Sequence, residues 1–318
     1  MKIKVDRWNP DAEVILKAGA ILRDGGLVAF PTETVYGLGA NGLKAEAVGK
    51  IFLAKGRPSD NPLILHLADA KDAGALAEID ERASEVMAAF WPGPLTIVLR
   101  ARSCVPAEVT GGLPTVAMRV PDHPVALALI EAAGCPVAAP SANLSGRPSP
   151  TDAEAVAADL GSEVDMILDA GRVDIGLEST VIDLTGQKVV LLRPGGTIVE
   201  RLEAFFGEPL ALPDDDFKRR SPGTRYKHYA PSVSVRVWTA GERLHDSMDP
   251  AKSGFIGVSS PPAEFARVIS FESEENYARG VFAGFRQLEA EGLNIVAEWP
   301  RPQGIGLALR DRIRRASL

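Results

Sequence analysis

Short apolar runs alternate with amphipathic stretches from residue 1 to about residue 208. The amphipathic stretches repeat apolar residues at helical spacing, and the first, which Asn9 can cap, stops at a glycine pair. The apolar runs have the length of buried strands, at 26–30, 61–68, 95–101, 115–121, 136–142, 166–171, 179–184 and 188–195. Interleaved strands and helices of this kind predict an α/β or α+β domain with a mixed sheet.

The composition changes at residues 213–231, with the sequence PDDDFKRRSPGTRYKHYAP. Three acids precede a basic cluster and then Pro, Gly and Tyr, a pattern typical of an interdomain linker. Further strand patterns follow, with a helix pattern at 276–292. We therefore predict a first domain at 1–208, a linker at 209–231 and a small Rossmann-like α/β domain at 232–318.

The length of 318 residues, 46% of them hydrophobic, suffices for two domains with sizeable cores. The formal net charge of −7 disfavours tight, non-specific binding along nucleic acid backbones. No run approaches the length of a membrane span and the N-terminus lacks an apolar signal segment, so we expect a cytoplasmic protein. Cys104 and Cys135 belong to no metal-binding motif, and no metal-ligating residues are expected.

The stretch GLGANG at 37–42 has the glycine spacing of the dinucleotide-binding fingerprint. That fingerprint starts at the end of a strand and opens directly into a helix, whereas here residues 31–36 separate the glycines from the strand pattern. The sequence also does not match a Walker A loop, because that motif requires Ser or Thr after Gly-Lys and here Gly49-Lys50 is followed by Ile51. The glycines instead predict a tight loop beside the polar residues 32–34.

Four short motifs occur in order: PTETVYGLG at 31–39, KGR at 55–57, NPLILH at 61–66 and SAN at 141–143. Together they resemble the YrdC-type domain of the threonylcarbamoyl-AMP synthase family. The motif SPGTRYKHYAP at 221–231, followed by a small α/β domain, resembles the long, two-domain form of that family. The resemblance covers essentially the whole chain and implies a YrdC-like twisted mixed sheet with flanking helices.

The resemblance also implies an enzyme, a nucleotidyltransferase. Members of the family join L-threonine, bicarbonate or carbon dioxide, and ATP into threonylcarbamoyl-AMP and pyrophosphate, and Mg²⁺ accompanies the ATP. A partner transferase then passes the threonylcarbamoyl group to an adenosine of tRNA; direct tRNA binding by this acidic chain is expected to be weak or absent. Neither chemical step needs a protein nucleophile, so catalysis should depend on cations and hydrogen-bond donors.

By correspondence with the family, Lys55 and Arg57 are the catalytic residues and would hold ATP phosphates and the carbamate. The residues assigned to threonine are Thr34, His66, Arg119, Ala139 and Ser179. The residues assigned to ATP are Arg57, Asn61, Thr115, Ser141, Asn143, Ser149, Arg193 and Tyr229. Without the family, Lys55 and Arg57 are more typical of an exposed helix C-terminus, and His66 of a protein core.

The linker carries Arg225, Lys227, His228 and Tyr229. It is either a lid that folds over the pocket and excludes water or a passive tether. One alternative function is a non-catalytic RNA-binding module, which the net charge and the lack of interleaved aromatic and basic residues disfavour. A second is carbamoyl transfer of the hydrogenase-maturation type, whose zinc-finger cysteines are missing here.

Overall fold

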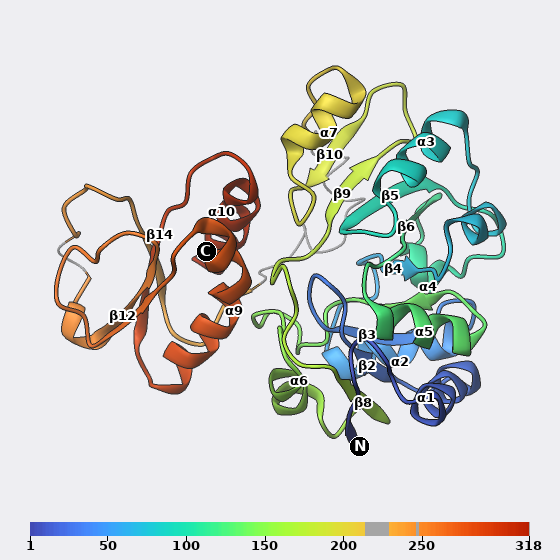
Figure 1. Cartoon of the computed structure of the whole chain (residues 1–318), viewed down its shortest axis with the longest axis horizontal. Helices are drawn as coiled ribbons and strands as arrows, with labels where there is room; N and C mark the ends of the chain where they lie inside the picture. The colour runs from blue at the N-terminus through green and yellow to red at the C-terminus, as the bar shows by residue number, and fades with distance from the viewer. Residues whose placement is uncertain (214–228, 246–247, 318) are drawn as a thin grey trace.

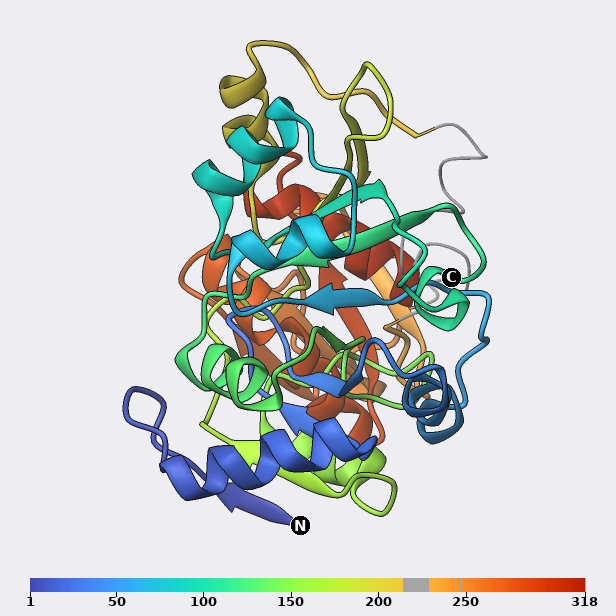
Figure 2. The ribbon, with the colours of Figure 1, turned by 90° about the vertical axis from the view of Figure 1, so that its right-hand side faces the viewer.

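The computed structural model describes residues 1–213, 229–245 and 248–317, and the chain forms two lobes of unequal size (Figure 1). The larger lobe contains one mixed sheet with the strand order β1-β8-β2-β3-β7-β4-β6-β5-β9-β10. In Figure 2 this lobe faces the viewer, with the N-terminus at the bottom and the yellow α7 segment at the top. Its strands are β1 (Lys2–Lys4), β2 (Val28–Phe30), β3 (Gly37–Asn41), β4 (Ile64–His66), β5 (Leu95–Arg100), β6 (Thr115–Arg119), β7 (Val137–Ala138), β8 (Met166–Asp169), β9 (Thr180–Asp183) and β10 (Val190–Arg193).

Helices cover both faces of the larger sheet. Side chains alternate across a strand, so Val28 and Phe30 pack with α1 and α5, whereas Leu27 and Ala29 pack with α2. Burial on both faces explains why these strands appear in the sequence as nearly continuous apolar runs. The helices of this lobe are α1 (Ala12–Asp24), α2 (Ala45–Lys55), η1 (Ala70–Ala75), α3 (Glu81–Phe90), α4 (Ala107–Thr110), α5 (Pro124–Ala133), α6 (Ala153–Leu160) and α7 (Val199–Phe206).

The smaller, C-terminal lobe has a parallel sheet with the order β11-β14-β12-β13. Its elements are β11 (Val235–Trp238), η2 (Pro250–Lys252), β12 (Ser253–Gly257), β13 (Arg267–Ser270), α9 (Glu274–Ala290), β14 (Asn294–Glu298) and α10 (Ile305–Ala316). Figure 1 shows α9 and α10 between this sheet and the larger lobe. The predicted fold class, a large mixed sheet with a small second α/β unit, is confirmed.

One hydrophobic cluster joins the two lobes. Val35 and Leu177 of the larger lobe and Tyr229 pack with α9 residues such as Tyr277 and Phe282. A shared apolar core of this kind opposes independent motion of the lobes. No helix in the described ranges is both long enough and apolar enough to cross a bilayer.

The loop predicted at the glycine motif is wrong, because Gly37–Asn41 form the buried strand β3, antiparallel to β2. A Cβ atom on Gly39 would lie 2.9 Å from Phe30 Cε1 and 2.9 Å from Val137 Cγ1. The backbone of Gly39 is not in the left-handed region. Glycine is therefore required by the close approach of neighbouring side chains and not by a turn.

The predicted start of the first helix is also wrong. The N-cap is Asp11, whose carboxylate accepts from the backbone N–H groups of Glu13 at 2.8 Å and Val14 at 3.3 Å. The backbone N–H of Asn9 instead donates to Asp6 at 2.8 Å, which holds the preceding segment in a turn. The predicted linker residues Arg225, Lys227 and His228 lie outside the described residues.

Candidate active site

A cavity lies in the larger lobe, where the ends of several elements meet. Strands β4 and β6 run parallel with His66 opposite Arg119, so both side chains stand at one level of the sheet. The segments before β3, after α2, after β7 and before β9 complete the walls. The predicted site residues that line this cavity are Thr34, Arg57, His66, Arg119, Ala139, Ser141, Asn143, Ser179, Arg193 and Tyr229.

The other predicted residues are buried but do not line the cavity: Lys55, Asn61, Thr115 and Ser149. Asn61 directly precedes the lining residue Pro62, and Thr115 begins strand β6. The hydroxyl of Ser149 donates to the lining carboxylate of Glu178 at 2.5 Å. Ser149 therefore holds a lining carboxylate without lining the cavity itself.

Arg119 is the most deeply buried cation in the cavity wall, with 2% of its surface exposed. Its Nη2 donates to Thr34 Oγ1 at 3.1 Å and to Glu33 Oε2 at 3.3 Å. Its Nε and Nη1 have no hydrogen-bond partner among the described residues. Burial lowers the pKa of Arg119 and raises that of Glu33, and the charge of each partner only partly opposes this effect. Two buried donors are thus left for an anionic ligand.

His66 contributes a neutral ring to the same end of the cavity. Burial, and then the charge of Arg119, lower the pKa of His66 well below its ordinary value of 6.5. Its Nδ1 lies 3.2 Å from the carbonyl oxygen of Ile64, and its ring meets Phe30 edge-on with 6.2 Å between centroids. The ring orientation is therefore fixed before a ligand enters.

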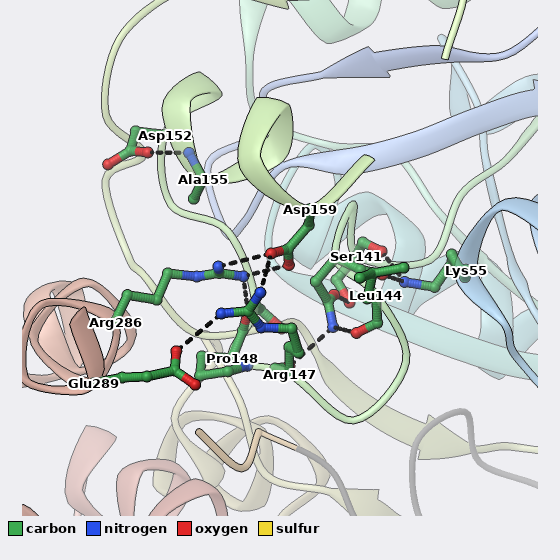
Figure 3. A network of polar contacts seen from close by, with 12 residues as sticks. Lys55, Ser141, Leu144, Arg147, Pro148, Asp152, Ala155, Asp159, Arg286 and Glu289 are labelled. Carbon is green, nitrogen blue, oxygen red and sulfur yellow. Dashed lines mark hydrogen bonds and ion pairs between the residues drawn. The ribbon is translucent and has the colours of Figure 1, made fainter. Parts of the chain in front are cut away.

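Lys55 shapes the loop that follows β7. Its Nζ donates to the carbonyl of Ser141 at 2.5 Å and to the carbonyl of Asn143 (Figure 3). The Ser141 hydroxyl donates to Asn143 Oδ1 at 2.6 Å, and Asn143 Nδ2 donates to the carbonyls of Leu144 and Arg147 at 2.7 and 2.9 Å. The SAN motif is thus a closed hydrogen-bonded turn whose side chains line the cavity.

Ser179 and Arg193 form the opposite wall. The hydroxyl of Ser179 lies 2.8 Å from Thr96 Oγ1, and its carbonyl accepts from Arg193 Nη2 at 2.9 Å. Burial lowers the pKa of Arg193, although a guanidinium keeps its charge at neutral pH. This wall therefore presents a hydroxyl and a fixed cation to a ligand.

Three buried charged residues at the site were not identified from the sequence alone. Glu33 pairs with Arg119, and Glu178 lines the cavity between the two walls. Arg312, on α10 of the C-terminal lobe, donates through Nε to Glu178 Oε2 at 2.6 Å. Glu33 and Glu178 stand directly beside predicted residues in PTET and LEST, a local signal that could have identified them. Arg312 has no such neighbour.

An ion-pair network ties the C-terminal lobe to the segment after the SAN motif (Figure 3). The fully buried Asp159 carboxylate on α6 accepts from Arg147 at 3.0 Å and from Arg286 of α9 at 2.7 Å. Arg147 also pairs with Glu289 of α9 at 2.9 Å. The loop that carries Ser141 is therefore held by Lys55 on one side and by the C-terminal lobe on the other.

The polar groups that line the cavity are guanidinium groups, hydroxyls, one amide, the imidazole of His66 and the carboxylate of Glu178. The guanidinium and hydroxyl donors suit anionic ligands. Such groups can hold and orient phosphates and carboxylates and stabilise charge that develops between them. In the described part of the chain, no three His, Cys, Asp or Glu residues gather as metal ligands.

The comparisons with known proteins cover the whole chain. A family model described as "Telomere recombination" matches residues 20–195, and a model described as "Threonylcarbamoyl-AMP synthase, C-terminal domain" matches residues 197–317. The chain is 44% identical to the threonylcarbamoyl-AMP synthase of Pyrococcus abyssi, covering 99% of this chain and 95% of that protein. It is 43% identical to the threonylcarbamoyl-AMP synthase of Bacillus subtilis, covering 99% of this chain and 98% of that protein.

Solved structures agree with these sequence matches. The crystal structure of P. abyssi Sua5 complexed with L-threonine covers 100% of this chain and 97% of its own, with a TM-score of 0.91 and 43% sequence identity. The crystal structure of E. coli YciO covers 61% of this chain and 94% of its own, with a TM-score of 0.56 and 31% identity. The similarity to P. abyssi Sua5 thus includes both lobes.

Proposed function

This chain belongs to the threonylcarbamoyl-AMP synthase family, and we propose that its cavity joins L-threonine, a carboxyl unit and ATP. The chain is an enzyme that transfers AMP, and its product is threonylcarbamoyl-AMP with release of pyrophosphate. Bicarbonate or carbon dioxide supplies the carboxyl unit. The alternative of a non-catalytic RNA-binding module is not favoured, because the full-length relatives are named as synthases.

The observation that carries the proposal is the buried guanidinium of Arg119. Its Nε and Nη1 have no partner among the described residues, although the side chain is 2% exposed and lines the cavity. Leaving such donors unsatisfied costs about 1–3 kcal/mol or more for a charged group, so a carboxylate ligand is the simplest way to satisfy them. In the proposal this is the threonine carboxylate, and the surrounding contacts come from Thr34, His66, the Ala139 backbone and Ser179.

The remaining donors suit the nucleotide. Arg57 on one side and Arg193 on the other would hold phosphate oxygens, Ser141 and Asn143 would contact the nucleotide from their hydrogen-bonded turn, and the Tyr229 ring would face the nucleoside. Asn61, Thr115 and Ser149 stay assigned to ATP in this proposal and are buried residues that do not line the cavity. Lys55 would hold the Ser141 loop in place beside the nucleotide.

The chemistry follows from this arrangement. The free amine of threonine attacks carbon dioxide, forming a C–N bond and losing a proton to give a carbamate. A carbamate oxygen then attacks the α-phosphorus of ATP, and the bond to pyrophosphate breaks. Both steps bring negative groups together, so the fixed cations lower the barrier by holding and shielding them, and no covalent protein intermediate is formed.

Magnesium would enter with ATP. The described residues hold no cluster of three ligating side chains, and Glu178 is already bonded to Ser149 and Arg312. The donor set therefore fits Mg²⁺ bound mainly by phosphate oxygens and water, where it would neutralise phosphate charge. A separate transferase would consume the adenylate to modify tRNA, and direct tRNA binding by this chain is proposed to be weak.

Pyrophosphate release tests the proposal. The assay contains ATP, Mg²⁺ and bicarbonate, with threonine, with serine or with no amino acid, and mass spectrometry identifies the product. We expect threonine-dependent release, slower release with serine, and loss of activity in Arg57→Ala. Lys50→Ala, at an exposed position on helix α2, which ends two residues before Arg57, is the control and should retain activity. Equal release without an amino acid would show that threonine is not the substrate.

A further inference from the structure

The largest fully buried side chain of the described residues is Arg312, which belongs to the C-terminal lobe but contacts the wall of the cavity. Besides the 2.6 Å contact with Glu178, its Nη1 donates to the carbonyl of Pro194 at 3.1 Å and to Asp311 at 2.7 Å. Pro194 follows the lining residue Arg193. A fully buried arginine is rare unless it is paired, so this contact is a strong constraint on how the lobes meet.

Arg312 also contacts the aromatic ring at the cavity wall. Its Cζ lies 5.4 Å from the centroid of the Tyr229 ring, which stacks on Phe282 of α9 with 5.3 Å between centroids. Tyr229 has a φ of 65°, unusual for a residue other than glycine, and is 5% exposed. The C-terminal lobe therefore holds this ring in a conformation that the local backbone does not favour.

We propose that Arg312 is a positioning residue for the nucleotide half of the cavity, which is the part lined by Glu178, Arg193 and Tyr229. It fixes the Glu178 carboxylate and the Tyr229 ring at the wall and balances the charge of Glu178, so the C-terminal lobe is a structural part of the active site. This inference rests on the proposed function, because it takes the ligand of that half to be a nucleotide.

Arg312 affects nucleotide binding through the charge of Glu178. Burial alone would raise the pKa of Glu178, but the charges of Arg312 and Arg193 and the hydrogen bond from Ser149 hold it below its ordinary value. Glu178 is therefore ionised in a cavity built for anions, and Arg312 makes the closest charged contact with it. Without Arg312, this carboxylate would repel phosphates or would take up a proton.

Direct binding of Mg²⁺-ATP in the absence of threonine, measured by titration calorimetry on the full chain, tests the inference. We expect Arg312→Met to weaken ATP binding by about tenfold or more, because one partner of a buried ion pair is removed. Arg314→Met is the matched control, since Arg314 lies on the same helix with an exposed side chain. It should bind ATP within about twofold of the unchanged chain.

The double variant Glu178→Gln/Arg312→Met separates charge balance from packing. It should recover most of the lost affinity, because the unpaired carboxylate is gone. The single variant Arg312→Met should also bind ATP better as the pH is lowered, because Glu178 becomes easier to protonate, whereas the double variant should lack this pH dependence. Unchanged affinity in Arg312→Met, or a double variant as weak as the single one, would overturn the inference.

Two features keep the test decisive. If Arg312→Met does not fold, weak ATP binding by a folded Glu178→Gln/Arg312→Met protein would still overturn the charge-balance role. The readout is ATP affinity and not turnover, so it is independent of which amine reacts. If pyrophosphate release proved independent of threonine, the proposed function would fail while the Arg312 variants would still test the nucleotide site.

Discussion

The ammonium nitrogen of Lys55 lies 2.5 Å from the carbonyl oxygen of Ser141, and it also donates to the carbonyl of Asn143. The lysine of the KGR motif is therefore bonded to the backbone of the loop after β7. Arg57, two residues further on, lines the cavity instead. Within one motif, the first cation shapes the loop and the second faces the ligand.

Substituting these two residues should separate their effects. Lys55→Met leaves two buried carbonyl groups without their side-chain donor, so we expect the free energy of unfolding to fall by about 3 kcal/mol and ATP binding to weaken. Arg57→Met should abolish pyrophosphate release while lowering the free energy of unfolding by less than about 1 kcal/mol. Urea denaturation and the pyrophosphate assay measure the two quantities. A fully stable but inactive Lys55→Met protein would mean that this ammonium contacts the ligand.

Substitution of Arg119 should weaken the binding of threonine selectively. Lysine has a single side-chain nitrogen and lacks the planar fork that lets Arg119 bond Glu33 and Thr34 through Nη2 while Nε and Nη1 face a ligand carboxylate, so Arg119→Lys should raise the KM for threonine by about a hundredfold. The KM for ATP should rise less than about threefold, since the nucleotide is assigned to other donors. Glu33→Gln keeps an acceptor for Arg119 and should change the KM for threonine by less than about fivefold. Equal increases in both KM values would contradict the assignment.

Much of the architecture could be predicted because the signals are local. The strand pattern at 61–68 contains β4. The amphipathic stretch KAEAVGKIFLAKGR at 44–57 predicts a helix broken by Gly56, and α2 ends there, with Gly56 in the left-handed conformation at a φ of 58°. Strand β3 could not be predicted in this way. Its glycines resemble loop residues until Phe30 and Val137 are seen to leave no room for a side chain.

The contribution of the C-terminal lobe to the site was not predictable from local sequence. The stretch IGLALRDRIRRA forms α10, and nothing in its local sequence distinguishes the fully buried Arg312 from the exposed Arg314. The difference arises because Glu178, 134 residues earlier, lies opposite Arg312 in the folded chain. Pairing over such a separation depends on how the two lobes pack and leaves no periodic pattern in the sequence.

Acid should destabilise the protein because the buried side chain of His123 must take up a proton. Burial, and then the charge of Arg7, lower the pKa of His123 to about 4. The unfolded chain, with a histidine pKa of about 6.5, therefore binds more protons between these values. The stabilising contribution is complete above about pH 6.5 and is lost as the pH falls towards 4, at about 1.4 kcal/mol per pH unit.

Denaturation curves over this pH range test the sign of the effect. His123→Gln should lose less stability between pH 6.5 and 4 than the unchanged chain does. His245→Gln, at an exposed position, should follow the unchanged chain. His66 has a lowered pKa too, so acid sensitivity should persist in part in His123→Gln. Identical pH profiles for the two variants would refute the role of His123.

The last prediction compares two glycines within the N-terminal motif region. Gly39→Ala places a Cβ atom 2.9 Å from Phe30 and Val137, both buried in the sheet, so we expect the free energy of unfolding to fall by about 1–3 kcal/mol. Gly49 lies inside helix α2, where an added Cβ atom would meet no other atom within 4 Å, so Gly49→Ala should raise it by about 0.5–1 kcal/mol. Thermal and urea unfolding of both variants provide the measurement. If Gly39 were only a turn residue, as its spacing first suggests, the substitution would not disturb the packing around Phe30. The near-ultraviolet circular dichroism spectrum and the free energy of unfolding of Gly39→Ala would then match those of the unchanged chain.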